Sequence, residues 1–289
     1  MTAPAPRYTP HGQAADEAVH GLLQRAFAAL GSRKLLPVEA IAHYVIGDYG
    51  RAQGWVAREG GGWVPYDTPH LLILLPEDFE EEARAAHAAI QASLEEVCME
   101  AGYSLRIDVA TARALLERGN EKLAFEVAGG RHLCWSFGGH DPLEAFVGLT
   151  PERLSAHGLV TLVEVGSSLR EITEWSASDT LGLHQGIVRL AFIRCIEVVS
   201  ALGDAILLSK GRYAPSLADR LRALAAMGDG GEVNPQLVQL YRAAIALRTR
   251  QPEPRLPAWA EVKALGAEVL VWARHVAHAH FGAQVADPA

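Results

Sequence analysis

Hydrophobic and polar positions follow different periods along the first half of the chain. Apolar side chains recur at helical spacing over residues 14–30 and stop at Gly31, which predicts an amphipathic helix. Residues 38–46 and 104–109 alternate as strands do, and the run LLILL at 71–75 predicts a fully buried strand. Further predicted elements are an acidic-fronted helix at 77–101, a short helix at 111–118 and an edge strand at 131–135.

The second half of the chain has a helical pattern throughout. Its apolar positions predict a bundle of about five helices, separated by proline and glycine breaks. These helices are expected at residues 159–175, 181–209, 216–227, 235–250 and 259–281. The sequence GGHDP at 138–142 is interpreted as a linker, and the proline-rich residues 1–11 are expected to be disordered. We therefore expect an α+β protein, with a mixed-sheet domain with flanking helices at 1–139 and an α-helical bundle domain at 140–289.

Charge and composition indicate which kinds of binding partner to expect. The 289 residues carry a net charge of -8, and neither half is basic enough to hold a nucleic acid through its phosphates. A small anionic ligand held by a few arginines is the expected partner instead. No apolar run approaches the ~20 residues needed to cross a bilayer, so no membrane partner is expected. The three cysteines lie far apart in apolar runs, which is typical of reduced thiols in a cytoplasmic protein.

The candidate chemistry lies between the first strand and the apolar strand. The sequence GDYGRAQG at 47–54 supplies a glycine turn and an arginine, and glycines let backbone N–H groups approach an anion closely. Arg51 would add charge-assisted hydrogen bonds, or it would instead pair with Asp48. Three further glycines at 60–62, flanked by Trp55 and Trp63, predict a hairpin.

Two stretches of this region resemble a known family. The sequence GDYGRAQG at 47–54, followed by YDTPHLLI at 66–73, resembles bacterial nucleotidyltransferase-like proteins of the DNA polymerase beta superfamily, which typically read GGYGRGEG and then YNDYDLLL. The segment 200–220 also resembles the ALGDALL, GxY, S and R pattern of that family's C-terminal helices. Together the matching parts run through most of residues 38–225. The matching residues of the glycine turn are Gly47, Tyr49, Gly50, Arg51 and Gly54.

The resemblance implies a fold and a reaction, but the sequence departs from the family's catalytic pattern. In the family, two aspartates at i and i+2 of a strand, with a third from a neighbouring strand, hold magnesium ions that clamp a nucleoside triphosphate. Here Thr68 and His70 occupy the places of the paired aspartates, and Asp108 matches the third. Asp67 lies one position before the first aspartate, where a strand side chain would point to the opposite face. Magnesium and a nucleoside triphosphate are the expected cofactors if the site is active, with Asp108 as metal ligand.

The remaining candidate residues allow more than one role. His70 would act as an acid or base with Asp108, as a ligand of a transition metal, or as a neutral hydrogen-bonded histidine. In the helical domain, the resemblance implies that Lys210, Tyr213 and Arg220 reach ligand phosphates. Salt bridges to acidic residues of the same domain are the competing use of these cations.

Three functional hypotheses follow. The first is a diverged nucleotidyltransferase-fold protein that keeps a cleft for a nucleotide or small anion but lacks two-metal nucleotidyl transfer. The second is a magnesium-dependent nucleotidyltransferase that modifies a small molecule or protein, with Asp108 and a rearranged Asp67 as ligands. The third is a non-catalytic partner or regulatory subunit in which the insert around Trp55 and Trp63 docks another protein.

Overall fold

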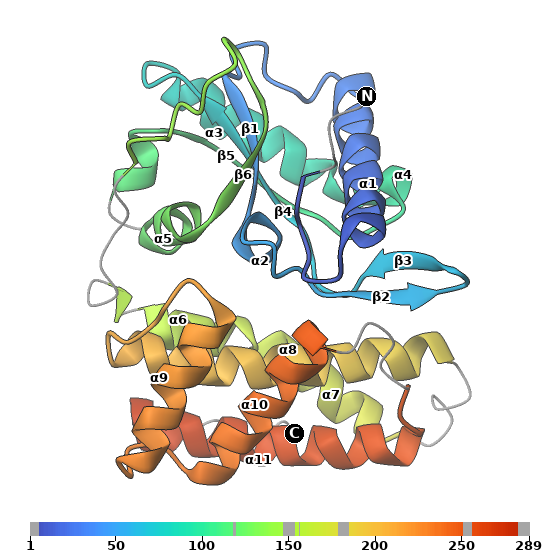
Figure 1. Cartoon of the computed structure of the whole chain (residues 1–289), viewed down its shortest axis with the longest axis vertical. Helices are drawn as coiled ribbons and strands as arrows, with labels where there is room; N and C mark the ends of the chain where they lie inside the picture. The colour runs from blue at the N-terminus through green and yellow to red at the C-terminus, as the bar shows by residue number, and fades with distance from the viewer. Residues whose placement is uncertain are drawn as a thin grey trace. The chain divides into compact units, whose positions relative to one another are not determined.

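The chain folds into two compact units, residues 1–149 and 150–289, with an α+β architecture. The structure is a computed structural model that describes residues 6–117, 120–146, 154–155, 157–178, 185–250 and 256–282. Strands occur in the first unit, whereas the described part of the second unit is helical (Figure 1). The first unit ends at residue 149 rather than at the predicted 139, because residues after the predicted linker still pack on its sheet.

A four-stranded mixed sheet forms the centre of the first unit. Its strands are β1 (Ala42–Ile46), β4 (His70–Leu75), β5 (Arg106–Thr111) and β6 (Arg131–Ser136), in the spatial order β5-β4-β1-β6. Strand β1 is antiparallel to β4 and β6, and β4 is parallel to β5. A separate antiparallel ribbon of β2 (Val56–Glu59) and β3 (Gly62–Pro65) confirms the predicted hairpin.

Helices cover both faces of the sheet, and this explains why β4 is apolar throughout. Its residues Leu71, Ile73 and Leu75 join one hydrophobic core with α1 (Gln13–Ser32), α3 (Glu80–Ala92) and α4 (Leu94–Ala101). Its residues Leu72 and Leu74 join a second core with η1 (Ala114–Leu116) and α5 (Glu121–Gly129). Every residue of β4 is therefore buried, as expected for a strand between two helical layers.

Two helical predictions for the first unit needed correction. The predicted helix at 77–101 is two helices, α3 and α4, separated at Ser93, whose backbone leaves the helical region. Both helices thereby present apolar residues to the same core. The chain also contains α5, which was not predicted because the helix is short; Leu123 and Val127, at i, i+4 spacing, are its contacts with the second core.

The predictions for residues 6–11 and for the linker also differ from the structure; residues 1–5, for which disorder was also predicted, lie outside the described residues. Tyr8 and Thr9 are fully buried rather than disordered, because their backbone N–H groups both bond to Asp16. In the predicted linker, Asp141 accepts hydrogen bonds from the Tyr44 hydroxyl and the Arg131 guanidinium. The next residues pack into the second core of the sheet, so 138–142 belongs structurally to the first unit.

The second unit is built around one long buried helix. Helix α8 packs against the five helices α6, α7, α9, α10 and α11, and its sequence is apolar on most sides. The bounds are α6 (His157–Glu164), α7 (Gly166–Ser176), α8 (Gln185–Ser209), α9 (Leu217–Asp229), α10 (Pro235–Arg250) and α11 (Trp259–Phe281). The helix predicted at 159–175 is interrupted at Val165 and forms α6 and α7. The start of the helix predicted at 181–209 lies partly outside the described residues.

Within the described part of the chain, no helix combines the length and apolar character that spanning a membrane requires.

Candidate functional site

Strand pairing brings the candidate residues of the first unit to one region of the sheet. Ile46, the last residue of β1, pairs with His70, the first residue of β4, so the glycine turn begins next to His70. On the other side of β4, Leu72 pairs with Asp108 of β5. His70 and Leu72 point to the same face because side chains alternate along a strand. His70 and Asp108 are therefore neighbours on the face that α5 covers.

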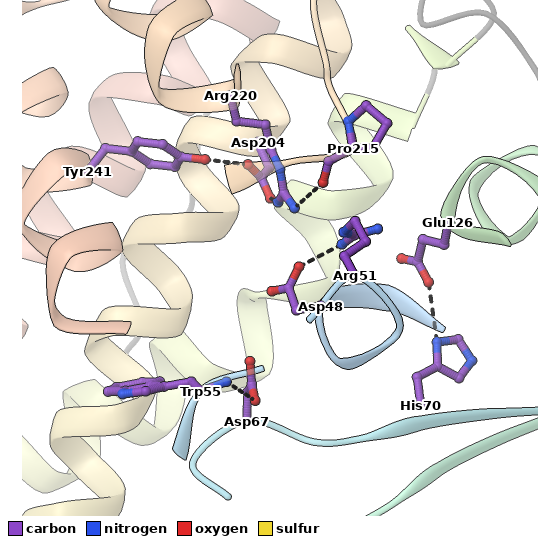
Figure 2. A network of polar contacts seen from close by, with 10 residues as sticks. All are labelled: Asp48, Arg51, Trp55, Asp67, His70, Glu126, Asp204, Pro215, Arg220 and Tyr241. Atoms are coloured by element: carbon purple, nitrogen blue, oxygen red, sulfur yellow. Dashed lines mark hydrogen bonds and ion pairs between the residues drawn. The ribbon is translucent and has the colours of Figure 1, made fainter. Parts of the chain in front are cut away.

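His70 lies between two carboxylates and is almost completely buried. Its Nε2 is 2.5 Å from Oδ2 of Asp108. Its Nδ1 is 3.2 Å from Oε2 of Glu126 on α5 (Figure 2). The side chain of His70 is 8% exposed, and each carboxylate is 19% exposed. An ionised carboxylate only accepts hydrogen bonds, so both ring nitrogens must carry a proton to satisfy this arrangement. The geometry identifies His70 as an imidazolium held by two anions.

The electrostatics of the three groups agree with this assignment. Burial by itself lowers the pKa of His70, but hydrogen bonds to Asp108 and Glu126 outweigh it and raise that pKa above its usual value. Burial raises the pKa of Glu126, but the bond to His70 outweighs it and the net pKa is about 2. The pKa of Asp108 is also lowered, because His70 and Arg106 offset its burial. The direction of each shift therefore favours the charged form of the group.

Two further side chains lie at the edge of this cluster, on Asp108. The Nε atom of Arg106 is 3.3 Å from Oδ2 of Asp108, and its side chain is 53% exposed. His87, on α3, places its Nδ1 3.9 Å from Oδ1 of the same carboxylate. Asp108 therefore has His70 and Arg106 beside Oδ2 and His87 beside Oδ1. We call His70, Asp108, Glu126 and Arg106 the sheet ion cluster.

The donor set of the sheet ion cluster does not fit a resident divalent metal ion. The imidazolium lies between the two carboxylates, so their oxygens already have a cationic partner. Among the described residues, no group of three or more His, Cys, Asp or Glu side chains is arranged to hold a metal ion. His70 also lacks a free lone pair, which a metal ligand or a general base would need.

The glycines of the turn have packing roles in this structure. The turn forms a four-residue helix, α2 (Gly47–Gly50). A Cβ at Gly50 would lie 2.6 Å from the carbonyl oxygen of Val45 and 2.8 Å from that of Gly130, so the turn approaches two strands closely. A Cβ at Gly54 would overlap the buried ring of Tyr49, whose hydroxyl donates to the carbonyl of Trp55. Gly47 has a φ of 70°, which favours glycine.

Arg51 pairs with Asp48, as one of the two alternatives from the sequence proposes. Its guanidinium is 2.6 Å from Oδ1 of Asp48, and its side chain is 9% exposed (Figure 2). The aliphatic part of Arg51 packs on Gly130, where a Cβ would overlap it. The charge of Arg51 is thus balanced within the turn itself.

Asp67 and Thr68 do not join the sheet ion cluster. Oδ1 of Asp67 accepts a hydrogen bond from the backbone N–H of Trp55 at 3.1 Å (Figure 2). The carbonyl of Asp67 accepts from the hydroxyl of Tyr103. Thr68 is exposed. Asp67 therefore closes the loop between the turn and β4, and the side chain of Trp55 is fully buried instead of forming a docking surface.

The candidate residues of the second unit form a separate buried network. Arg220 of α9 is 2.7 Å from Oδ2 of Asp204 on α8, and the hydroxyl of Tyr241 on α10 donates to the other oxygen at 2.8 Å (Figure 2). Arg220 also donates to the carbonyl of Pro215, and its guanidinium lies 4.9 Å from the ring centroid of Tyr213. We call Asp204, Arg220 and Tyr241 the helical ion network. Lys210 is exposed after the end of α8.

Glu126 is the site residue that sequence reasoning missed. Its helix was not predicted, and a single glutamate carries no motif. The available signal was the i, i+4 pair Leu123 and Val127, which identifies a helix whose position 126 borders the apolar face. Comparison of the chain with protein-family models, with curated proteins and with solved structures finds no significant match, so the family resemblance stays a prediction from the motifs.

Proposed function

We propose that this chain is a diverged nucleotidyltransferase-fold protein that binds a nucleotide or another small anion without two-metal nucleotidyl transfer. The observation that carries the proposal is the position of His70. Its imidazolium lies against Asp108, the residue that matches the third carboxylate of the family pattern, and takes the place of a divalent cation there. A positive side chain at this point would also repel incoming metal ions.

Other candidate site residues support the same proposal. Thr68 offers a hydroxyl where the family has a carboxylate, and the carboxylate of Asp67 bonds to the backbone of Trp55. The mixed sheet with a glycine turn after β1 agrees with the expected fold. For the anion, Arg106 provides an accessible guanidinium at the edge of the sheet ion cluster.

Two assays on the purified full chain test the proposal. With each nucleoside triphosphate and magnesium, we expect no release of pyrophosphate above the rate without protein. Calorimetric titration with the same nucleotides, and with inorganic pyrophosphate, is expected to show binding that does not require magnesium. The substitution Arg106→Gln should weaken this binding, whereas Arg84→Gln, which removes an exposed arginine paired with Glu80 on α3, should not. Magnesium-dependent pyrophosphate release would refute the proposal.

A second candidate is a non-catalytic partner or regulatory subunit, and the glycine turn favours it. Arg51 is buried and neutralised by Asp48, and Gly50 and Gly54 pack against protein atoms, so the turn is filled from within. This candidate predicts that neither nucleotides nor pyrophosphate bind in the calorimeter, with or without magnesium.

A further inference from the structure

The segment that precedes α1 is built into the first unit by a buried carboxylate. Residues 6–12, which we call the strap, lie alongside α1 (Figure 1). The N–H groups of Tyr8 and Thr9 each donate to Oδ1 of Asp16 at 2.8 Å, and Asp16 is only 4% exposed. Tyr8 joins the core that covers one face of the sheet. The strap is therefore held by directed hydrogen bonds and by burial.

The strap is also bonded to the end of the glycine turn. The N–H of Gly54 donates to the carbonyl of Tyr8 at 3.1 Å. Gly54 in turn packs on the ring of Tyr49, which lies inside the turn. Displacement of Tyr8 would leave the Gly54 N–H without this acceptor and loosen the segment that connects the turn to β2.

Two imidazole rings contact the Tyr8 ring. The ring of His20 on α1 stacks on it at a centroid distance of 6.2 Å, and its Nδ1 shares a hydrogen bond with the Tyr8 hydroxyl at 3.2 Å. The ring of His132 on β6 meets it edge to face at 5.2 Å. Both imidazoles thus lie at the point where the strap enters the core.

We propose that residues 6–12 form a proton-sensitive strap, in which protonation of His132 releases Tyr8 from its pocket and frees the Gly54 end of the glycine turn. A cation on His132 would be half-buried, and it would face the second imidazole, His20. Release of the strap exposes His132 to water and separates it from Tyr8, so the proton binds more tightly to the open state.

The surroundings of His132 also determine in which direction pH changes the opening of the strap. Burial, and then the neighbouring His20, lower the pKa of His132 below its usual value. The closed state is therefore fully favoured above about pH 6.5, and it loses stability as pH falls from there toward the lowered pKa. For one linked proton, the open fraction rises by up to about tenfold per pH unit over this range.

His132 itself faces the Tyr8 ring of the strap and His20 of α1, and further charged or titratable groups surround Tyr8. Asp16 and His20 face it from α1, and Cys134 faces it from β6; burial raises the pKa of the Cys134 thiol to about 11, so that group stays neutral. The strap itself carries Arg7, which is exposed, and His11, whose ring stacks on Trp63 of β3. The hydrogen bond from the loop after α2 comes from the backbone of Gly54.

Hydrogen exchange of the full chain tests the proposal. Exchange of residues 6–12 and of Gly54, corrected for the chemical rate, is compared at about pH 7.5 and about pH 5.5. We expect opening to increase about 3- to 10-fold at the lower pH. The substitution His132→Phe keeps an aromatic edge toward Tyr8 but cannot bind a proton, so it should abolish the increase. His132→Gln serves the same purpose if the phenylalanine variant does not fold.

His43→Phe is the matched control. His43 is a ring on the adjacent strand β1, and burial lowers its pKa to about 4, so it stays neutral throughout the tested range. This variant should keep the wild-type response. Unchanged exchange between the two pH values in the wild-type protein, or a response that persists in both His132 variants, would overturn the proposal.

Discussion

The sheet ion cluster and the helical ion network both bury charge, but they balance it differently. In the helical ion network, one arginine faces one aspartate, and a tyrosine hydroxyl satisfies the second oxygen. In the sheet ion cluster, one imidazolium faces two carboxylates, and a half-exposed arginine completes the balance at the edge. Arginine keeps its charge at any ordinary pH, whereas histidine does not. The charge balance of the helical ion network is therefore independent of pH, whereas that of the sheet ion cluster depends on the proton of His70.

This difference bears on what each motif residue does. Arg220 lies in a pattern that the resemblance assigns to phosphate binding, yet its guanidinium pairs with Asp204 and donates to the carbonyl of Pro215. Asp108 lies where the resemblance places a metal ligand, and an imidazolium occupies the adjacent volume. Arg220 and Asp108 thus both pair with protein groups, and the following changes separate the two networks.

The largest effect is expected for Arg220→Met. Removal of this cation leaves Asp204 buried without its ionic partner, which costs about 3–5 kcal/mol of unfolding free energy. Urea denaturation of the full chain measures the loss. Arg222→Met is the control, because Arg222 is 80% exposed and pairs with Asp219 at the surface; it should cost less than about 1 kcal/mol. Equal losses in the two variants would contradict a structural role specific to Arg220.

The next effect is expected for His70→Gln, with a loss of about 2–3 kcal/mol at neutral pH, since Arg106 still pairs with Asp108. The pKa of His70 is raised, so its contribution is complete below about pH 6.5 and is lost as pH rises through the folded pKa. The pKa of Glu126 is lowered to about 2, so its contribution is lost as pH falls from 4.5 toward that value.

Denaturation at a series of pH values checks the direction expected for His70. The difference in stability between the wild-type protein and His70→Gln should shrink on the alkaline side. The corresponding difference for Arg220→Met should stay constant there, because the guanidinium does not titrate. A His70→Gln difference that grows with pH would show that His70 is neutral in the folded protein.

A smaller effect is expected for Gly54→Ala. The added Cβ overlaps the Tyr49 ring, which must move within a packed core at a cost of about 1–3 kcal/mol. Gly166→Ala on α7 is the matched control, because a Cβ there meets no atom within 4 Å, and alanine is the better helix former. Thermal unfolding should thus move in opposite directions in the two variants. Similar shifts would mean that Gly54 is not confined by Tyr49.

The smallest effect concerns metal binding. His70→Asp replaces the imidazolium with a third carboxylate beside Asp108 and Glu126, and the uncompensated acids then favour a divalent cation. Manganese or magnesium at ten times its Kd should stabilise this variant by about 1.4 kcal/mol, seen as a rise in Tm. The wild-type protein should show no such rise. A wild-type response equal to that of the variant would contradict the assignment of His70 as the resident cation.

The hydrophobic pattern was sufficient to predict much of the architecture. The run at 71–75 predicted a fully buried strand, and β4 is buried on both faces because a helical layer covers each one. The change to helical periodicity after residue 143 predicted the helical second unit. These inferences succeed because burial requires an apolar residue at every second position of a strand, or at every third and fourth position of a helix. The resulting hydrophobic period is visible in the local sequence.

The contacts of charged side chains depended on tertiary structure. Glu126 meets His70 only because α5 covers that face of β4, and Asp108 meets it only because β5 pairs in parallel with β4 in one register. Likewise, Asp16 holds the strap through backbone groups that carry no sequence signal. Spacing along the chain determines which face of an element a residue occupies. The partner of a buried charge depends instead on strand register and on packing between distant segments, because two charges interact strongly only when they lie within a few ångströms of each other.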